Sequence, residues 1–193
     1  MRAALASGAV NWNAGEIYGS PERNSLQLLS EYFTKYPSDA DKVILSIKGG
    51  CKPGTIEPLA TKENVSRSIE ECLKHLDGKK TLDLFECARL DGSTPLEETI
   101  GTIVEYVKAG KVGGISLSEV NANTIKKAHA IHPISAVEVE FSLWSTDILT
   151  NGVAQACGEL GIPIVAYSPL GRGFLVRLHA LVCSSLIMQL MLG

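Results

Sequence analysis

A tyrosine and a lysine are the first residues of this sequence whose types and positions suggest chemistry. Tyr18 lies in "NWNAGEIYGS" (11–20), just after a short apolar run, and Lys48 ends the run "KVILSIK" (42–48). A phenol has a pKa of about 10 and is by itself a slow proton donor at neutral pH. A nearby ammonium favours the phenolate, lowers that pKa and suits the phenol better to general acid catalysis. The alternative is structural, with Tyr18 a half-buried loop aromatic and Lys48 a solvated strand end.

Other polar residues follow apolar runs at points where a strand would end. In a parallel barrel the carboxyl ends of the strands form one face, and barrel enzymes build their sites on that face. We therefore expect a site there. The residues at these strand ends are Glu16, Tyr18, Lys48, Glu86, Arg89, Ser118, Glu119, Glu138, Glu140, Tyr167 and Ser168.

Short strands alternating with longer helices are the elements that would position these residues. Helical patterns predict helices at 22–36, 61–78, 95–111, 121–131 and 147–161, and apolar runs predict strands at 9–14, 42–48, 81–88, 113–118, 136–142 and 163–168. This alternation favours βα units and a parallel sheet. The strands keep polar residues that would point inward, which favours a barrel. The alternative is a doubly wound sheet, but "NAGEIYGS" (13–20) matches its Gly-rich first turn poorly.

Composition excludes several classes of partner. The 193 residues carry a net charge of -3 and show no basic cluster, so we expect no nucleic acid partner. Five scattered cysteines form neither a disulfide framework nor a CxxC pattern, which indicates a reducing cytoplasm. We expect no metal: Cys87 is interpreted as a buried small residue, and His129 and His132 as a surface pair. The almost uncharged stretch from Leu178 is too short to span a bilayer, so no membrane anchor is expected.

Six segments carry a family resemblance. They are "NWNAGEIYG" (11–19), "KVILSIKGG" (42–50), "TLDLFECARLD" (81–91), "GKVGGISLSEV" (110–120), "AVEVEFSLW" (136–144) and "VAYSPLGRGFL" (165–175). In this order they resemble the signature blocks of the aldo-keto reductases, and most closely the fungal pyridoxal reductase branch. The resemblance implies a (β/α)8 barrel of the TIM type. It also implies hydride transfer from NADPH to a small aldehyde, pyridoxal-like by branch.

The resemblance also implies roles for individual residues. Tyr18 would be the general acid that protonates the carbonyl oxygen, and Lys48 the ammonium that tunes it. Tyr167 would stack on the nicotinamide ring. Ser118, Glu119 and Glu138 match the positions that bind the carboxamide. The loop that approaches the pyrophosphate, where glycine allows close contact with the backbone, is matched by Ser168, Leu170, Gly171 and Gly173.

Four positions depart from the wider family: Glu119 and Glu138 stand where it usually has amides, and two further positions concern catalysis. Asn13 stands where the family has Asp; it can hydrogen-bond Lys48 but cannot neutralise it. Ala88 stands where the family has His, and losing such a contact to the substrate oxygen typically costs about 100-fold in rate. Glu86 has the same strand parity as position 88 and would supply a carboxyl group to the cavity.

The resemblance covers an incomplete barrel. Eight strands are needed, and we expect this chain to supply about six: a partial barrel over 1–175, truncated at both ends, and an atypical apolar tail over 176–193. The first strand, the last helix, the eighth strand and the segment that grips the adenosine 2′-phosphate would be missing. Two hypotheses follow. One is an NADPH-dependent reductase; the other is a catalytically weak or inactive fragment that binds other chains through its open barrel edges.

Overall fold

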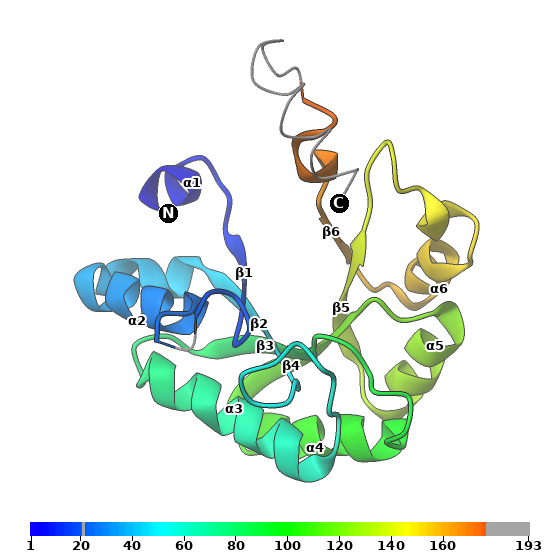
Figure 1. Ribbon diagram of the computed structural model, residues 1–193, viewed down its shortest axis with the longest axis horizontal. Helices are drawn as coiled ribbons and strands as arrows, with labels where there is room; N and C mark the ends of the chain where they lie inside the picture. The colour runs from blue at the N-terminus through cyan, green and yellow to red at the C-terminus, as the bar shows by residue number, and fades with distance from the viewer. Residues whose placement is uncertain (21, 177–193) are drawn as a thin grey trace.

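The computed structural model describes residues 1–20 and 22–176, and this part of the chain forms six parallel strands backed by helices (Figure 1). Each strand pairs with the next in chain order. The sheet curls into an arc, with the first and last strands at its two ends and the helices along its outer side (Figure 1). The strands are β1 Asn11–Gly15, β2 Ile44–Gly49, β3 Leu82–Cys87, β4 Val112–Ser118, β5 Ile134–Glu140 and β6 Ile164–Tyr167.

The helices lie before, between and after the strands, and those between strands make the crossover connections that a parallel sheet requires. They are α1 Arg2–Ala6, α2 Ser25–Lys35, α3 Lys62–Leu76, α4 Leu96–Lys108, α5 Ala122–Ile131 and α6 Val153–Leu160, with short 3-10 turns η1 Pro37–Lys42, η2 Asp147–Leu149 and η3 Gly171–Gly173. The prediction of a single helix at 147–161 is wrong, because this segment forms η2 followed by α6. Gly152 has a φ of 86°, a left-handed conformation that interrupts a helix, and it separates η2 from α6.

The core lies between the outer face of the sheet and the helices. Leu45 and Ile47 of β2 are fully buried there, and α3 packs Val65 and Ile69 against the sheet. Because successive strand residues point to opposite faces, the residues between these apolar positions face the inside of the arc. The inner residues are largely polar, including Asn13, Ser46, Glu86, Ser116 and Glu138, which together line a small void.

The architecture confirms the fold predicted from sequence. It is an α/β fold of the (β/α)8 TIM-barrel type in which the described residues supply six of the eight strands, curled into a half-barrel. All six predicted strands are present within a few residues of their expected ends. Apart from Val176, the apolar tail predicted at 176–193 lies outside the described residues. None of the helices described here is both long and apolar enough to cross a lipid bilayer.

Candidate active site

A buried lysine and two carboxylates form the centre of the half-barrel. Lys48, near the carboxyl end of β2, is 4% exposed. Its Nζ lies 3.1 Å from Oε1 of Glu86 on the neighbouring strand β3 and also forms an ion pair with Glu138 on β5. Burial alone would lower the pKa of Lys48, but the two carboxylates outweigh burial and raise it. The side chain therefore stays a charged ammonium inside the protein.

Asn13 completes this cluster from β1. Its Nδ2 donates hydrogen bonds to Oε2 of Glu138 at 2.5 Å and to Oε1 of Glu86 at 3.3 Å. The sequence-based expectation was that Asn13 would bond Lys48 and leave it without a neutralising partner. The structure differs: Asn13 orients the two carboxylates, and these provide the negative charge beside Lys48. We call Asn13, Lys48, Glu86 and Glu138 the lysine cluster.

Glu86 is the member of the cluster whose protonation is most perturbed. Its side chain is fully buried, and its Oε2 has no hydrogen-bond partner in the described part of the chain. Burial raises the pKa of Glu86 to about 7, opposed by Lys48 and reinforced by Glu138. A void of about 20 Å³ adjoins the carboxyl group, room for a single water molecule. Glu86 can therefore hold or release a proton near neutral pH.

Tyr18 lies in the loop between β1 and α2, with 43% of its surface exposed. An added Cβ at Gly15 would lie 3.3 Å from Tyr18 Cδ2 and 3.4 Å from Lys48 Cβ, so Gly15 allows the tyrosine ring to approach β2. Burial raises the pKa of Tyr18; Lys48 lowers it, and Glu138 and Glu86 raise it further. Lys48 does lower the pKa of Tyr18, as the sequence predicted, but burial and the two carboxylates raise it by more.

Tyr167 ends β6 on the same side of the sheet. The Nζ of Lys48 lies 6.0 Å from the centre of the Tyr167 ring. Burial and a hydrogen bond with Glu119 raise the pKa of Tyr167 to about 12. Glu119 also accepts a hydrogen bond from the Glu140 backbone N–H at 2.7 Å, which ties the loops after β4 and β5 together. The aromatic ring is thus held beside the lysine cluster.

The loop after β6 has an unusual backbone. Ser168 and Arg172 have positive φ angles (52° and 56°), although neither is glycine. Glu119, in the loop after β4, also has a positive φ of 52°. Left-handed backbone costs about 1–3 kcal/mol at such residues and is concentrated at binding sites. At Gly173 an added Cβ would meet nothing within 4 Å, so the backbone of this loop is open to contact. This openness suits the predicted approach to a pyrophosphate.

The residues predicted to bind a carboxamide differ in how many hydrogen bonds and ion pairs they already make within the protein. The buried Ser118 hydroxyl accepts one hydrogen bond, from Arg89 Nη1 at 3.3 Å. Both oxygens of Glu138 are engaged, one by Lys48 and one by Asn13. Its role toward a carboxamide therefore stays a prediction, in competition with the ion pair.

The described cysteines and candidate metal ligands form no separate site. The thiols of Cys51, Cys72, Cys87 and Cys157 are free and buried, and burial raises the pKa of Cys87 to about 12, which makes it a poor nucleophile. Over residues 1–20 and 22–176, no three His, Cys, Asp or Glu side chains form a group that could hold a metal ion.

Comparison with known proteins identifies the family. The sequence profile of the aldo/keto reductase family matches residues 1–180. The chain belongs to the aldo/keto reductase family. Among curated relatives of this aldo/keto reductase is a Schizosaccharomyces pombe protein named "Probable pyridoxal reductase 2", 48% identical over 176 residues that cover 91% of this chain and 53% of the relative. A Saccharomyces cerevisiae protein that also carries a pyridoxal reductase name is 40% identical over 172 residues, covering 85% of this chain and 49% of the relative.

These matches confirm the resemblance to the fungal pyridoxal reductases, and they define its extent. The chain spans about half the length of the curated relatives it matches. A crystal structure of a thermostable aldo-keto reductase with the inhibitor epalrestat superposes with a TM-score of 0.76 at 23% identity, covering 91% of this chain and 61% of that one. This likeness supports the fold.

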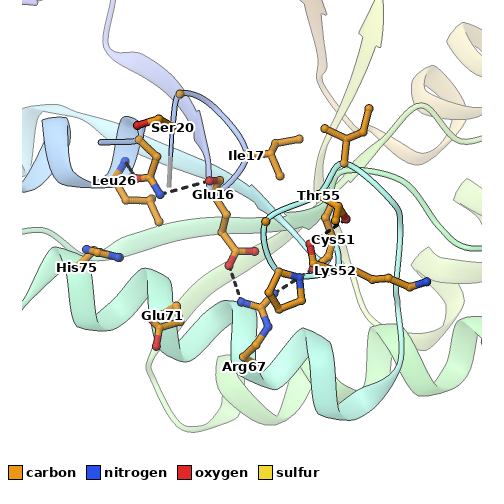
Figure 2. A pocket seen from close by; sticks show the side chains of 15 residues that line it. Glu16, Ile17, Ser20, Leu26, Cys51, Lys52, Thr55, Arg67, Glu71 and His75 are labelled. Carbon is orange, nitrogen blue, oxygen red and sulfur yellow. Dashed lines mark hydrogen bonds and ion pairs between the residues drawn. The ribbon is translucent and has the colours of Figure 1, made fainter. Parts of the chain in front are cut away.

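One set of polar contacts was missed by the sequence analysis. Arg67 of α3 contacts Glu16 in the loop that carries Tyr18 (Figure 2), and the neighbouring Ser68 donates to the same carboxylate. In the sequence they look like ordinary polar residues of an amphipathic helix, and no spacing rule links them to Glu16, which is about 50 residues earlier. Only the packing of α3 against the two loops reveals the contact.

Proposed function

We propose that this aldo/keto reductase chain is an oxidoreductase that reduces a small aldehyde with NADPH, with Tyr18 as the general acid. The observation that carries the proposal is the lysine cluster: a buried ammonium held by two carboxylates at the carboxyl face, beside the Tyr18 loop and the Tyr167 ring. Burying charged groups of this kind carries a large desolvation penalty. Groups whose pKa values are strongly perturbed are concentrated at active sites.

Proton transfer is the step that the residues present can perform. The Tyr18 phenol, whose pKa is raised by burial, is protonated at neutral pH and is the group that would donate to a carbonyl oxygen. As the proton leaves, the Lys48 ammonium is the positive charge that stabilises the phenolate. Glu86 titrates near neutral pH beside Lys48, so it is suited to exchange a proton with the site after each turnover.

The cofactor predicted from the family fits the residues at the ends of β4 and β6. Tyr167 offers an aromatic face, Ser118 a buried hydroxyl, and the open backbone at Gly173 an approach for a phosphate group. NADPH, when bound, would supply the hydride. The residues that would hold it are Ser118, Glu119, Glu138, Tyr167, Ser168, Leu170, Gly171 and Gly173. The preference for NADPH over NADH rests on the family resemblance.

A pyridoxal-like aldehyde is the substrate we propose, by similarity to the two fungal relatives named above. We propose a cytoplasmic location, because the four described cysteines are free thiols, as is typical of a reducing compartment.

A second candidate rests on the edges of the sheet. Among the described residues, β1 and β6 each pair with one strand only. Unpaired strand edges are templates for other chains, which favours a catalytically weak or inactive chain that associates through these edges.

Thermal unfolding with and without NADPH tests the proposal. A ligand at 100 times its dissociation constant stabilises the native state by about 2.7 kcal/mol, an easily measured upward shift. We expect such a shift, together with NADPH oxidation on adding pyridoxal. An unmoved transition combined with concentration-dependent self-association would overturn the proposal in favour of the second candidate.

A further inference from the structure

Helix α3 presents three polar side chains to the loops that follow β1 and β2. They are Asn64, Arg67 and Ser68, and Arg67 also lines an open cavity of about 670 Å³ beside these loops (Figure 2). Asn64 and Ser68 are buried and Arg67 is partly buried. Polar groups buried at this position need partners, and the two loops supply them.

The first loop is held through Glu16. Arg67 Nη1 donates to Glu16 Oε1 at 2.9 Å, and the Ser68 hydroxyl donates to the other carboxylate oxygen. The backbone N–H of Glu16 also donates to the Lys48 carbonyl at 3.1 Å. Tyr18 follows Glu16 by two residues. The carboxylate of Glu16 therefore anchors the loop on which Tyr18 is carried.

The second loop is held by the same helix residues. Ser68 Oγ accepts from the Gly50 N–H at 3.0 Å, and Arg67 Nη2 donates to the Cys51 carbonyl at 3.0 Å. Contact is so close at Gly49 that an added Cβ would lie 2.0 Å from Ser68 Oγ. Lys48 immediately precedes these residues, so its strand end is fixed to α3 at the same point as the Tyr18 loop.

Arg67 is suited to join the two loops because its guanidinium is a rigid fork. Nε donates to Asn64 Oδ1 at 2.9 Å, while Nη1 and Nη2 reach Glu16 and Cys51. A planar group bonded in three directions leaves little rotational freedom to its partners. Because Glu16 and Arg67 also line the open cavity, this bonding holds the Tyr18 loop at the edge of a space that protein atoms do not fill.

We propose that Glu16, Arg67 and Ser68 form a positioning clamp that sets Tyr18 against Lys48. The inference rests on the proposed function of Tyr18 and names residues that touch neither substrate nor cofactor. Misplacing a reacting group by about 1 Å can cost about 100-fold in rate, so the clamp should affect turnover more than substrate affinity.

The test compares Glu16→Ala with Glu71→Ala, because Glu71 lines the same cavity from α3 and, among the described residues, forms an ion pair with the exposed Lys74 alone. The main measurement is the absorbance titration of Tyr18, obtained by subtracting the titration of the matching Tyr18→Phe chain. Released from the clamp, the ring loses the burial that raises its pKa, so the pKa of Tyr18 should fall toward the ordinary value of about 10. Glu16→Gln, which keeps a side chain able to accept from Arg67, should restore most of the difference.

Turnover of the same variants gives the second measurement. We expect kcat to fall about tenfold to 100-fold in Glu16→Ala with little change in KM, and both to stay constant in Glu71→Ala. If Glu16→Ala does not fold, Arg67→Lys replaces it, because a lysine ammonium cannot span the three acceptors of the fork. The clamp would be overturned if the pKa of Tyr18 were the same in every variant. It would also be overturned if this pKa shifted as much in Glu71→Ala as in Glu16→Ala.

The two proposals can fail separately. If the titration responds as expected while the unaltered chain turns over no aldehyde, the clamp stands and the reductase proposal fails. If the chain is active but neither the titration nor kcat responds to Glu16→Ala, the clamp fails and the reductase proposal stands.

Discussion

Lys48 on β2 and Glu138 on β5 form an ion pair across the interior of the half-barrel, although β3 and β4 lie between their strands in the sheet. Asn13 on β1 bonds the same glutamate from the far end of the arc. Glu138 therefore connects the first, second and fifth strands through the interior. These contacts link β5 to β1 and to β2, neither of which pairs with it in the sheet, and they favour the curvature that brings the strand ends together.

Removing the charge of Glu138 should cost stability. In Glu138→Gln the buried Lys48 keeps Glu86 but loses its second carboxylate, and we expect a loss of about 1–3 kcal/mol in unfolding free energy. Chemical denaturation measures this loss. The matched control is Glu159→Gln, which breaks the exposed pair with Lys126 (2.8 Å) and should cost at most about 1 kcal/mol. Equal losses in the two variants would contradict a buried, structural role for Glu138.

Stability should depend on the protonation of Glu86. Its folded-state pKa of about 7 lies above the ordinary carboxyl value of 4.5, so the folded protein holds this proton more tightly than the unfolded chain. The stabilisation is fully present below about pH 4.5 and is lost as the pH rises through about 7. Glu86→Gln should remove this component, and denaturation curves at pH 5 and pH 8 should then differ less than in the unaltered chain. An unchanged difference would show that another group titrates.

Tyr18→Phe should abolish proton donation without disturbing the fold. General acid catalysis typically contributes about 100-fold to 10,000-fold, so aldehyde reduction should fall by at least about 100-fold. Because the Tyr18 side chain is 43% exposed, the melting temperature should change little. Tyr106→Phe, on the outer helix α4, is the control. Turnover retained in Tyr18→Phe would assign the proton donor elsewhere, with Glu86 the next candidate.

Asp91 should stabilise the loop after β3. It accepts hydrogen bonds from the backbone N–H groups of Thr94 (2.7 Å) and Ala60 (2.8 Å), the latter in the loop before α3. Burial opposes the charge of Asp91, but these hydrogen bonds outweigh burial and hold its pKa well below the usual range. Such a carboxylate stabilises the fold above its unfolded pKa, and the effect is lost as the pH falls below about 4. Asp91→Asn should cost about 1–3 kcal/mol at pH 7 and much less in acid, as measured by urea unfolding.

The fold was predictable because its signals are local. Apolar residues such as Leu45 and Ile47 alternate with inward polar residues, and the predicted helices show apolar periodicity, whereas the short α1 buries no residue and was not predicted. The site was predictable only in part. Tyr18, Lys48 and Glu86 could be assigned to strand ends, since those positions follow from the strands. The pairing of Lys48 with Glu138 depends on how far the sheet curls, which no local pattern encodes. The raised pKa of Tyr18 depends on burial, which spacing does not reveal.

The buried cysteines have a consequence for how the chain can be studied. Cys51 follows β2, Cys72 lies on α3, Cys87 ends β3 and Cys157 lies on α6, and all four are almost inaccessible to solvent. An alkylating reagent can modify each thiol only while its surroundings are open, so the four rates report four local opening equilibria. Measured separately for each cysteine-containing peptide, the alkylation rates would show whether the β2–β3 region or the α6 end of the arc opens more readily. The native sequence thus carries its own probes of how the six described strands come apart.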